Sequence, residues 1–510
     1  MFAQVNSLGL FGMNAFAVQV EIDISRGQPM FEVVGLPDAA VRESRERIKS
    51  ALRACGVAFP VARVMVNLAP ANTKKTGSVY DLAILMAILQ ATGRLPALPK
   101  DSCFLGEVSL NGSLRPVSGV LPMVLLAREQ GIRQIFLPAD NAYEASVASG
   151  IAVYGVENVS QLLDHFDGEH ALTPQPAYVP TAVEAEPVPD FSDVRGQNFA
   201  KRALEIAAAG GHNTLLIGTP GSGKSMLAKR MPGILPEMTF GESIQTTNIH
   251  SVAGLLDPRQ PLVTVRPFRS PHHTISAAGL AGGGSIPHPG EISLAHNGLL
   301  FLDELAEFDR RTLEILRQPL EDHTVTISRA SSGTITYPCT IMLIAAMNPC
   351  PCGYYGHPQR KCTCSQNQVQ QYLSKVSGPL LDRFDLHVDV APVCFEDLTG
   401  TGKEESSADI RERVQAARKI QQQRFTDTAI TCNAQITPDL LRTYCPMTDR
   451  AQQRLKDVFE RMGLSARAYD RLLKVARTIA DLDGVETLDL RHVTEAVQYR
   501  SLDRKYKTHT

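Results

Sequence analysis

The sequence predicts an α/β protein whose C-terminal part is helical, and three patterns carry this prediction. Short apolar runs alternate with helical stretches over the first 170 residues. In the middle of the chain a glycine-rich loop, "GTPGSGKS", stands between a short apolar run and a helical pattern. Residues 411–510 show helical periodicity with almost no strand signal, and Ser465 is suited to cap one of these helices. Alternating strand and helix patterns are typical of α/β domains built on a parallel sheet.

Two stretches divide the chain into three predicted domains. Residues 171–190 contain five prolines and no helical or strand period, which indicates a linker stiffened by proline. A second, polar linker is expected at 396–410. The predicted domains are therefore an α/β domain at 1–170, a central α/β domain at 191–395 and a helical segment at 411–510.

The composition is that of a globular protein without a strong charge bias. The chain has 510 residues, enough for roughly two to four domains, with 44% hydrophobic and 20% charged residues. Because the net charge is −2, any binding of nucleic acid must come from local basic patches. The N-terminus lacks a basic segment followed by an unbroken apolar run, and no apolar stretch reaches the ~18 residues of a membrane span. We therefore expect a cytoplasmic protein with reduced thiols and no membrane partner.

The glycine-rich loop has the pattern of a phosphate-binding loop. Glycines allow backbone N–H groups to turn inward around a phosphate chain, and this chemistry needs a strand before the loop and a helix after it. Lys224 is expected to reach the β- and γ-phosphates of ATP, and Ser225 to offer its hydroxyl to Mg²⁺. The predicted nucleotide-contacting residues of the loop are Gly218, Thr219, Pro220, Gly221, Ser222, Gly223, Lys224 and Ser225.

Two further strands are predicted to end in polar residues beside this loop. The apolar run 299–302 is followed by Asp303 and Glu304, which suits Asp303 for holding Mg²⁺ and Glu304 for polarising the attacking water. The segment 339–349 predicts a third strand that ends in Asn348, which can reach the γ-phosphate and the attacking water. An ordinary turn before the next proline would explain Asn348 equally well. Because ligands of parallel sheets bind at the carboxyl ends of the strands, we expect the three strand ends to meet.

Longer segments of the sequence resemble a known family. Residues 191–210, "FSDVRGQNFAKRALEIAAAG", resemble the first helix of an AAA+ ATPase module. The segments 268–305 and 377–390 narrow the resemblance to the magnesium-chelatase-like branch of these ATPases. Residues 33–52 and 67–85 resemble the N-terminal domain of the ComM/YifB members of that branch. The sequence is therefore similar to the ComM/YifB family over nearly its whole length.

The resemblance implies an AAA+ P-loop core with a parallel sheet, followed by a helical lid, in a homo-oligomeric and hexameric ring. Arg383, in "LLDRFD", matches the arginine finger, which acts on the ATP of the neighbouring subunit. Arg467, in "SARAYDRLL", matches the sensor-2 arginine of the lid and is expected among the nucleotide contacts. The guanidinium group suits both roles because it stays charged and its fixed fork of donors matches phosphate oxygens.

The N-terminal domain resembles the proteolytic domain of Lon, a ribosomal S5-like α/β fold in which a lysine activates a serine. Ser78, in "TKKTGSVYDL", falls where the nucleophile would be, but Leu121 occupies the position of the lysine. A hydroxyl without a base is a poor nucleophile, so we expect no peptidase activity. Lys74 and Lys75 precede Ser78 and are the alternative source of a base. We expect that the fold was kept for assembly or partner binding.

Four cysteines follow Asn348 closely in the pattern Cys-x-Cys, nine residues, Cys-x-Cys: Cys350, Cys352, Cys362 and Cys364. Their loop is rich in Gly, Pro, Tyr and Arg and cannot build a core of its own, which favours a structural Zn²⁺ bound by four thiolates. The spacing argues against zinc, because paired cysteines of zinc knuckles usually have two to four residues between them. Free thiols and a redox switch are the alternatives, while a disulfide within Cys-x-Cys would be strained.

A hairpin is predicted between the strands that carry Asp303 and Asn348. Residues 322–338 form two β-branched, alternating runs around "RASSG", whose Ser-Ser-Gly supplies the turn. In ring helicases similar to this family, a hairpin at this place points into the central pore, which makes Arg329 the candidate DNA contact. Such phosphate contacts are independent of sequence and sensitive to salt. The alternative is a hairpin that only packs between subunits.

The sequence assigns no function to two neighbouring motifs. The adjacent pair His272–His273 suggests a metal, but adjacent side chains diverge on a helix or a strand, so we do not expect a shared ion. Arg269 stands close by, and its chemistry alone assigns it no role.

These patterns lead to one principal hypothesis, a ring-forming AAA+ ATPase that couples ATP hydrolysis to movement on single-stranded or branched DNA. The resemblance implies a helicase or branch-migration factor in recombination and natural transformation. The alternatives are the motor subunit of a metal chelatase, a protein remodeller and an ATP-dependent peptidase. Dedicated chelatase motors lack the fused Lon-like domain, and the peptidase would lack its lysine.

Overall fold

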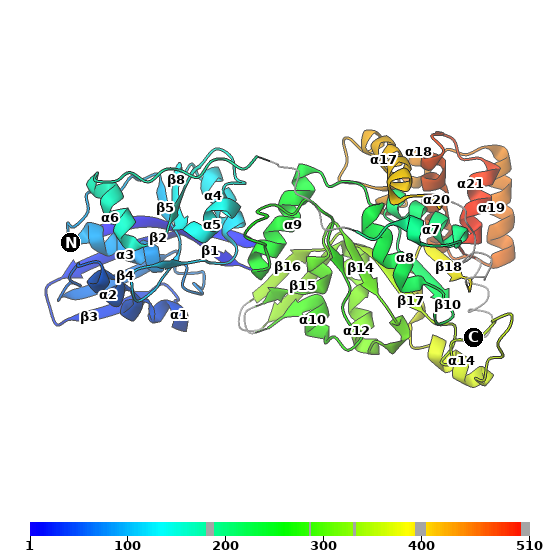
Figure 1. Cartoon of the computed structure of the whole chain (residues 1–510), viewed down its shortest axis with the longest axis horizontal. Helices are drawn as coiled ribbons and strands as arrows, with labels where there is room; N and C mark the ends of the chain where they lie inside the picture. Colours follow the sequence, from blue (N-terminus) through cyan, green and yellow to red (C-terminus); the bar gives the residue numbers. More distant parts are fainter. Residues whose placement is uncertain (180–187, 285–286, 330–332, 393–403, 501–510) are drawn as a thin grey trace.

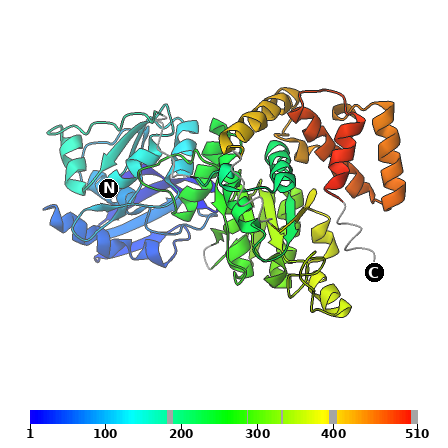
Figure 2. The same cartoon turned by 45° about the vertical axis from the view of Figure 1, so that its right-hand side comes forward.

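The computed structural model shows an elongated molecule in three parts. An N-terminal sheet, a central sheet and a C-terminal group of helices follow one another along the longest axis (Figure 1). The view turned by 45° shows the C-terminal helices as a group of their own at one end (Figure 2). The structure describes residues 1–179, 188–284, 287–329, 333–392 and 404–500.

The N-terminal part is a mixed seven-stranded sheet in the order β3-β4-β2-β1-β5-β8-β9. β2 pairs antiparallel with β1 and with β4, and the other pairs are parallel. Helix α3 packs on this sheet with nearly every residue buried, because its sequence "DLAILMAILQA" is apolar on all faces. The strands of this part are β1 (Phe2–Phe11), β2 (Asn14–Ser25), β3 (Met30–Val34), β4 (Arg63–Ala69), β5 (Ser102–Phe104), β6 (Glu107–Val108), β7 (Leu114–Arg115), β8 (Gln134–Pro138) and β9 (Ala152–Val156). The helices are α1 (Ala39–Arg42), α2 (Ser44–Ala54), α3 (Asp81–Ala91), α4 (Val120–Glu129), α5 (Ala139–Ala145) and α6 (Val159–Asp167).

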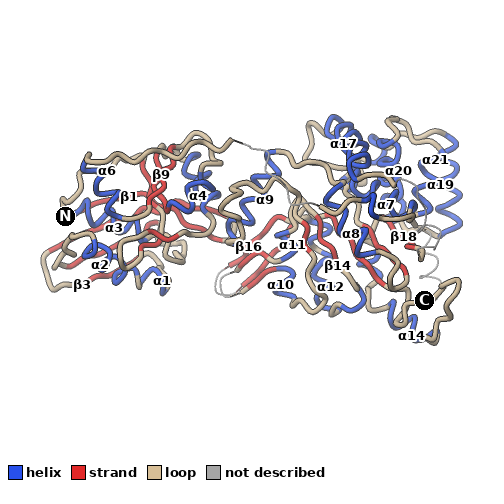
Figure 3. The backbone as a smooth tube through the Cα atoms, in the orientation of Figure 1, coloured by secondary structure: helices blue, strands red, loops and turns tan. Residues whose placement is uncertain are grey.

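The central part is a parallel five-stranded sheet in the order β11-β14-β17-β10-β18, seen in red in Figure 3. Its inner strands are continuous apolar runs because helices and loops cover both faces. The strands are β10 (Thr214–Gly218), β11 (Phe268–Arg269), β14 (Leu299–Leu302), β17 (Met342–Met347) and β18 (Leu386–Val390), with the small pair β12 (Gly282–Gly283) and β13 (His288–Pro289) beside them. The helices are α7 (Asn198–Gly210), α8 (Lys224–Arg230), α9 (Phe240–Ala253), α10 (Ala277–Ala281), α11 (Glu291–Leu294), α12 (Arg310–Glu314), α13 (Pro319–Asp322), α14 (Gln366–Leu373) and α15 (Gly378–Leu381). The predicted α/β class with a parallel P-loop sheet is confirmed.

The C-terminal helices share an apolar core with one face of the central sheet. One cluster joins Leu216 and Val388 of the sheet, Ala207 of α7 and Leu472 of α20. Ser465 caps α20 with its side chain, as the sequence predicted. The helices are α17 (Ser407–Arg424), α18 (Leu441–Tyr444), α19 (Asp449–Met462), α20 (Ala466–Leu482) and α21 (Leu490–Gln498).

Helix α17 overlaps the end of the second predicted linker, of which residues 396–403 lie outside the described part of the chain. Helix α17 begins at Ser407, inside the stretch 396–410, because Ser406 and Asp409 form a capping box that starts the helix. Residues 180–187, which belong to the first predicted linker, lie outside the described part of the chain. The remaining domain boundaries stay a prediction.

The hairpin between the Asp303 and Asn348 strands is confirmed. β15 (Thr324–Arg329) pairs antiparallel with β16 (Gly333–Pro338) along its whole length. Residues 330–332 and the side chain of Arg329 lie outside the described structure. The base of the hairpin therefore has a defined register, while its predicted DNA contact stays a prediction.

The N-terminal and central parts are joined by polar and apolar contacts. Ser251, near the end of α9, donates a hydrogen bond to Glu144 of α5, and its carbonyl oxygen accepts one from the backbone N–H of Gly119 at 3.0 Å. A Cβ added to Gly12, in the turn between β1 and β2, would overlap Ile335 of β16. The N-terminal sheet thus contacts both α9 and the hairpin of the central part.

Asp481 of α20 holds the inside of the helical lid together. Its carboxylate accepts hydrogen bonds from Arg424 at 2.5 Å, Asn433 at 2.7 Å and Arg477 at 3.1 Å, and its side chain is fully buried. Asp481→Asn is expected to lower the free energy of unfolding by roughly 3–5 kcal/mol, because two guanidinium groups inside the lid would lose their counter-charge. Urea unfolding measures this loss, with Glu460→Gln on the exposed face of α19 as the control. Equal stability of the two variants would contradict the assignment.

Candidate nucleotide site

The phosphate-binding loop runs from the end of β10 to the start of α8. Gly221 and Gly223 have left-handed backbones with φ of 77° and 90°, a conformation that side-chain-bearing residues rarely adopt. Lys224, the first residue of α8, is buried, and its Nζ donates to the carbonyl oxygens of Gly218 at 2.8 Å and Thr219 at 2.9 Å. Burial lowers the pKa of Lys224. The lysine is therefore held at the centre of the loop, where the sequence predicted it.

The acidic pair lies directly beside this loop. The hydroxyl of Ser225 donates to Oδ2 of Asp303 at 2.6 Å, and Oδ1 of Asp303 accepts from the backbone N–H of Glu304 at 2.9 Å. Glu304 has a φ of 52°, which is uncommon for a residue other than glycine, and its side chain is 58% exposed. A hydroxyl and a carboxylate oxygen are hard ligands of the kind that Mg²⁺ prefers, so Ser225 and Asp303 fit the predicted metal-binding role.

Asn348 joins the same group of side chains. It follows β17, and its Oδ1 accepts a hydrogen bond from Nζ of Lys224 at 3.3 Å. The structure thus brings together Lys224, Ser225, Asp303 and Asn348 from the carboxyl ends of three neighbouring parallel strands. Glu304 lies at the exposed side of this group. The five residues form the carboxyl-edge site.

His273 is a neighbour of Glu304, a contact that the sequence analysis, which considered His272 and His273 only as a metal-binding pair, did not predict. Its Nδ1 lies 3.3 Å from Oε2 of Glu304, and the rings of His272 and His273 are 4.1 Å apart. Its loop follows β11, the strand beside β14, so its place after a strand of the same sheet is the signal that sequence reasoning could have used.

Arg269 forms a two-point ion pair with Glu291, with distances of 2.6 Å and 2.7 Å. This ion pair gives Arg269 a structural role.

Arg383 and Arg467 lie at the opposite edge of the central sheet. Arg383 precedes β18, and both arginines line a cavity of about 390 Å³ whose wall includes Asn213, just before β10, and Gly298, just before β14. This cavity therefore lies at the amino ends of the strands. A strand of five residues such as β10 spans roughly 13 Å. The structure does not bring Arg467 to the P-loop of its own chain, because the length of the sheet separates it from Lys224.

The lining of the cavity at the amino edge holds more basic than acidic side chains. Arg383 is buried, pairs with Glu321 at 2.5 Å and donates to the backbone carbonyl oxygens of Arg317 and Pro379. Arg467, by contrast, is exposed. The further basic side chains that line the cavity are Arg266, Arg418, Arg471 and Lys474, and the acidic ones are Glu242, Glu321, Asp385 and Asp470. This set of charges suits an anionic group, such as a phosphate chain, that approaches from outside the chain.

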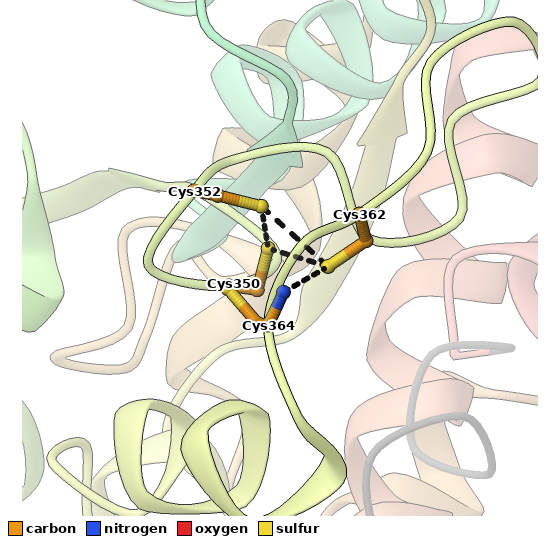
Figure 4. Close-up of side chains that lie close together, drawn as sticks. All are labelled: Cys350, Cys352, Cys362 and Cys364. Carbon is orange, nitrogen blue, oxygen red and sulfur yellow. Dashed lines mark hydrogen bonds between the residues drawn. The ribbon is translucent and has the colours of Figure 1, made fainter.

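The four cysteines form a compact cluster of sulfur atoms (Figure 4). The Sγ–Sγ distances are 3.4 Å for Cys350–Cys352, 3.5 Å for Cys352–Cys362 and 3.7 Å for Cys350–Cys362, and the Sγ atoms of all four, including Cys364, lie within 4.8 Å of one another. A tetrahedral zinc ion with bonds of about 2.3 Å needs sulfur separations of about 3.8 Å. A disulfide needs about 2.05 Å, and all four thiols are free. The cluster can hold a metal ion.

Backbone N–H groups around the cluster favour the thiolate form that a metal requires. Hydrogen bonds from the backbone of Tyr354 and Thr363 lower the pKa of the Cys352 thiol to about 5, whereas the neighbouring thiols raise the pKa of Cys362 and of Cys364. The backbone N–H of Cys364 donates to Sγ of Cys362 at 3.4 Å. Donors of this kind orient the ligands of metal sites and stabilise their charge.

Comparison with known proteins places the whole chain in one family. The family models "Magnesium chelatase, subunit ChlI", "Subunit ChlI of Mg-chelatase" and "Magnesium chelatase, subunit ChlI C-terminal" match residues 190–398, 20–141 and 404–500. The uncharacterized protein YifB of Escherichia coli is 42% identical over 505 residues, which cover 98% of this chain and 97% of YifB. The competence protein ComM of Haemophilus influenzae is 41% identical over 511 residues, which cover 98% of each chain. The chain belongs to the ComM/YifB family.

Membership in this magnesium-chelatase-like branch of the AAA+ ATPases supports ATPase activity with ATP and Mg²⁺. AAA+ proteins are typically oligomeric. The distance of Arg383 and Arg467 from the P-loop of their own chain agrees with this. Lon protease 2 of Bacillus subtilis is a more distant relative, 22% identical over 178 residues that cover 31% of this chain and 32% of that protein. In the described part of the chain, no helix combines the length and the apolar character needed to span a membrane.

The Lon-like part of this ComM/YifB chain has different contacts from those of a serine–lysine pair. Ser78 donates a hydrogen bond to the carboxylate of Glu107, and Leu121 is fully buried among apolar side chains. The amine of Lys75 donates to the carbonyl oxygen of Pro70. Among the described contacts, Ser78 therefore has a carboxylate and not an amine as its hydrogen-bond partner.

Proposed function

We propose that this protein is a hexameric, ring-forming ATPase that couples ATP hydrolysis to movement on single-stranded or branched DNA, as a helicase or branch-migration factor in recombination and natural transformation. The main support for a ring is that the phosphate-binding loop and the arginines lie at opposite edges of the central sheet. Lys224 and Asp303 lie at the carboxyl edge of the central sheet, and Arg383 lies at the amino edge. A complete site needs the carboxyl edge of one copy to face the amino edge of the next, and such head-to-tail contacts form a ring when the rotation between copies closes.

At the carboxyl edge each side chain has its own task in this proposal. Lys224 neutralises the β- and γ-phosphates, and Ser225 and Asp303 hold the Mg²⁺ ion, which supplies positive charge to the phosphate oxygens. Glu304 orients and polarises the attacking water, and Asn348 positions that water against the γ-phosphate. The contacts of Lys224 with Asn348 and of Ser225 with Asp303 support this division, because they already align the four groups.

Both arginines act in trans in this proposal. Arg383 and Arg467 of one copy approach the γ-phosphate bound by its neighbour and stabilise the charge that develops during hydrolysis. Arg383 then has to exchange its ion pair with Glu321 for the phosphate. The placement of both arginines on one cavity supports a shared role, because one anionic group that enters the cavity can contact both.

Two observations support the proposal that DNA is the partner. The relative ComM, which matches over the full length, carries the name of a competence protein. Strand β15 of the hairpin ends at Arg329, and six copies in a ring would bring six such arginines together. This local basic belt would not show in a net charge of −2.

We also propose Zn²⁺ as the ion of the four-cysteine cluster. Thiolates are soft ligands that select zinc among the common divalent cations, and zinc accepts four of them in a tetrahedron. The sulfur separations of 3.4 Å to 3.7 Å lie close to the ~3.8 Å of such a tetrahedron. Four protein ligands leave no open position for a substrate, so the ion would be structural.

The role of Glu304 can be tested with a change that keeps its shape. Glu304→Gln is expected to bind ATP normally, because Lys224 and Asp303 remain, and to hydrolyse it about 10²–10⁴ times more slowly, because the base is lost. Binding of a fluorescent ATP analogue and release of phosphate measure the two effects. Glu307→Gln is the control, since Glu307 is exposed and pairs with Lys375 on the surface. Near-normal turnover would remove Glu304 from this role.

The trans action of Arg383 can be tested by mixing subunits. Arg383→Ala and Lys224→Ala proteins are each expected to be inactive, whereas their mixture should recover part of the ATPase activity. Recovery is expected because some interfaces then pair an intact P-loop with an intact arginine. Mass photometry checks that mixed rings form. Mixed rings that stay inactive at every ratio would contradict the assignment.

DNA coupling can be tested by measuring ATP hydrolysis with and without single-stranded and branched DNA. DNA is expected to stimulate hydrolysis, and Arg329→Ala is expected to weaken DNA binding and to reduce the slope of log affinity against log salt by about one for each lost phosphate contact. Basal hydrolysis should survive. Arg310→Ala, an exposed arginine of α12, is the control. If the rings are intact and neither DNA changes the rate of ATP hydrolysis, a protein remodeller or a chelatase-type motor would be favoured instead.

A further inference from the structure

The loop that carries the four cysteines lies directly against the phosphate-binding loop. Gly353 has a φ of 83°, and its N–H donates to the carbonyl oxygen of Cys350 at 3.0 Å. A Cβ added to Gly353 would lie 2.5 Å and 2.6 Å from two ring carbons of Pro220, so glycine and proline ring are in van der Waals contact. Pro220 follows Thr219, whose carbonyl oxygen accepts a hydrogen bond from Lys224. The cysteine loop therefore supports the phosphate-binding loop from one side.

Both ends of the cysteine loop are anchored near the nucleotide site. At one end, Asn348 accepts a hydrogen bond from Lys224. At the other end, Ser365 starts α14 with a capping box, and Tyr372 of α14 is buried in the same apolar cluster as Ile217 of β10. Both ends of the loop are therefore held by elements that surround the nucleotide site.

The segment between these anchors has almost no apolar core. Of residues 349–364, only Pro349, Cys350 and Gly353 are buried. The sulfur–sulfur contacts join the two ends of the loop (Figure 4), and within it Arg360 donates a hydrogen bond to the hydroxyl of Tyr354. A segment that cannot bury apolar surface depends on a cross-link for its order, and a metal ion is such a cross-link.

We propose that a zinc ion bound by the four cysteines holds Gly353 against Pro220 and thereby sets the shape of the phosphate-binding loop, so that ATP turnover depends on metal occupancy. This inference rests on the proposed zinc site and the proposed ATPase activity. Without the ion, the four sulfur atoms lose the metal–thiolate bonds that hold them together, and the contact between Gly353 and Pro220 is released. A displacement of about 1 Å near reacting groups can cost on the order of 100-fold in rate.

The first test removes the ligands that are farthest along the loop from the P-loop contact. Cys362→Ser/Cys364→Ser is expected to lose the zinc that elemental analysis finds in the unchanged protein, at about one ion per chain. Its DNA-independent kcat for ATP should fall at least about tenfold. Amide hydrogen exchange over residues 218–224 should become faster. Cys55→Ser, in the N-terminal domain, is the control and should change none of these quantities.

The second test keeps the cysteines and disturbs only the contact. Gly353→Ala is expected to retain its zinc but to lower kcat, because the new Cβ pushes Pro220 away. Gly356→Ala is the matched control, since Gly356 is an exposed glycine of the same loop with a similar left-handed φ of 78°. Equal kcat values for the two variants would overturn the inference.

Four further outcomes decide the proposal. Zinc-free protein with full ATPase activity would overturn it, as would a double cysteine variant that loses its metal without any change in turnover or exchange. If the double variant does not fold, the test is made on the unchanged protein by removing the metal with a chelator and then adding Zn²⁺ back. A loss of ATP turnover that Zn²⁺ reverses supports the inference. If the unchanged protein hydrolyses no ATP, the proposed function fails, and the metal dependence of exchange at residues 218–224 still decides the inference.

Discussion

The common direction of the five strands in the central sheet decides where the chemistry of this protein takes place. All neighbouring strands are parallel, so every residue that follows a strand comes out at the same edge. Lys224 and Asn348 meet there although 124 positions separate them in the sequence. A residue that precedes a strand, such as Arg383, comes out at the other edge for the same reason. One reversed strand would place a phosphate contact on the wrong side, so the division of the site between two edges follows from the topology.

The helical lid adds its arginines to the amino edge through a buried polar connection. His212, just before β10, contacts Asp385 at 3.2 Å and Thr478 of α20 at 2.7 Å. Burial alone would raise the pKa of Asp385, but the hydrogen bond with His212 and the nearby Arg471 lower it to about 2. The carboxylate therefore keeps its charge inside the protein. This connection fixes the segment of Arg383 against α20, which explains why arginines of both elements line one cavity.

Leu121 of the N-terminal domain belongs to a connection between this domain and the central part. Its backbone N–H donates to Glu144 at 3.0 Å. Glu144 in turn accepts the hydroxyl of Ser251 from α9. Burial raises the pKa of Glu144, and these donors oppose the shift by stabilising its carboxylate. The contact of Gly12 with the β15–β16 hairpin is a second connection between the domains, so the Lon-like fold is physically linked to the element proposed to meet DNA.

Local chemistry was determined by the sequence alone. The loop 218–225 needs glycines with left-handed backbones, and Asn348 follows an apolar run of strand length, so both were predictable from short segments whose preferences are set by neighbouring residues. The tertiary structure decided which groups meet. Arg467 shares a cavity with Arg383 and not with the P-loop, His273 lies beside the Glu304 carboxylate, and the sulfur atoms converge from both sides of a nine-residue gap. These contacts join residues on different elements, and the packing of those elements, which no single segment encodes, sets their distances.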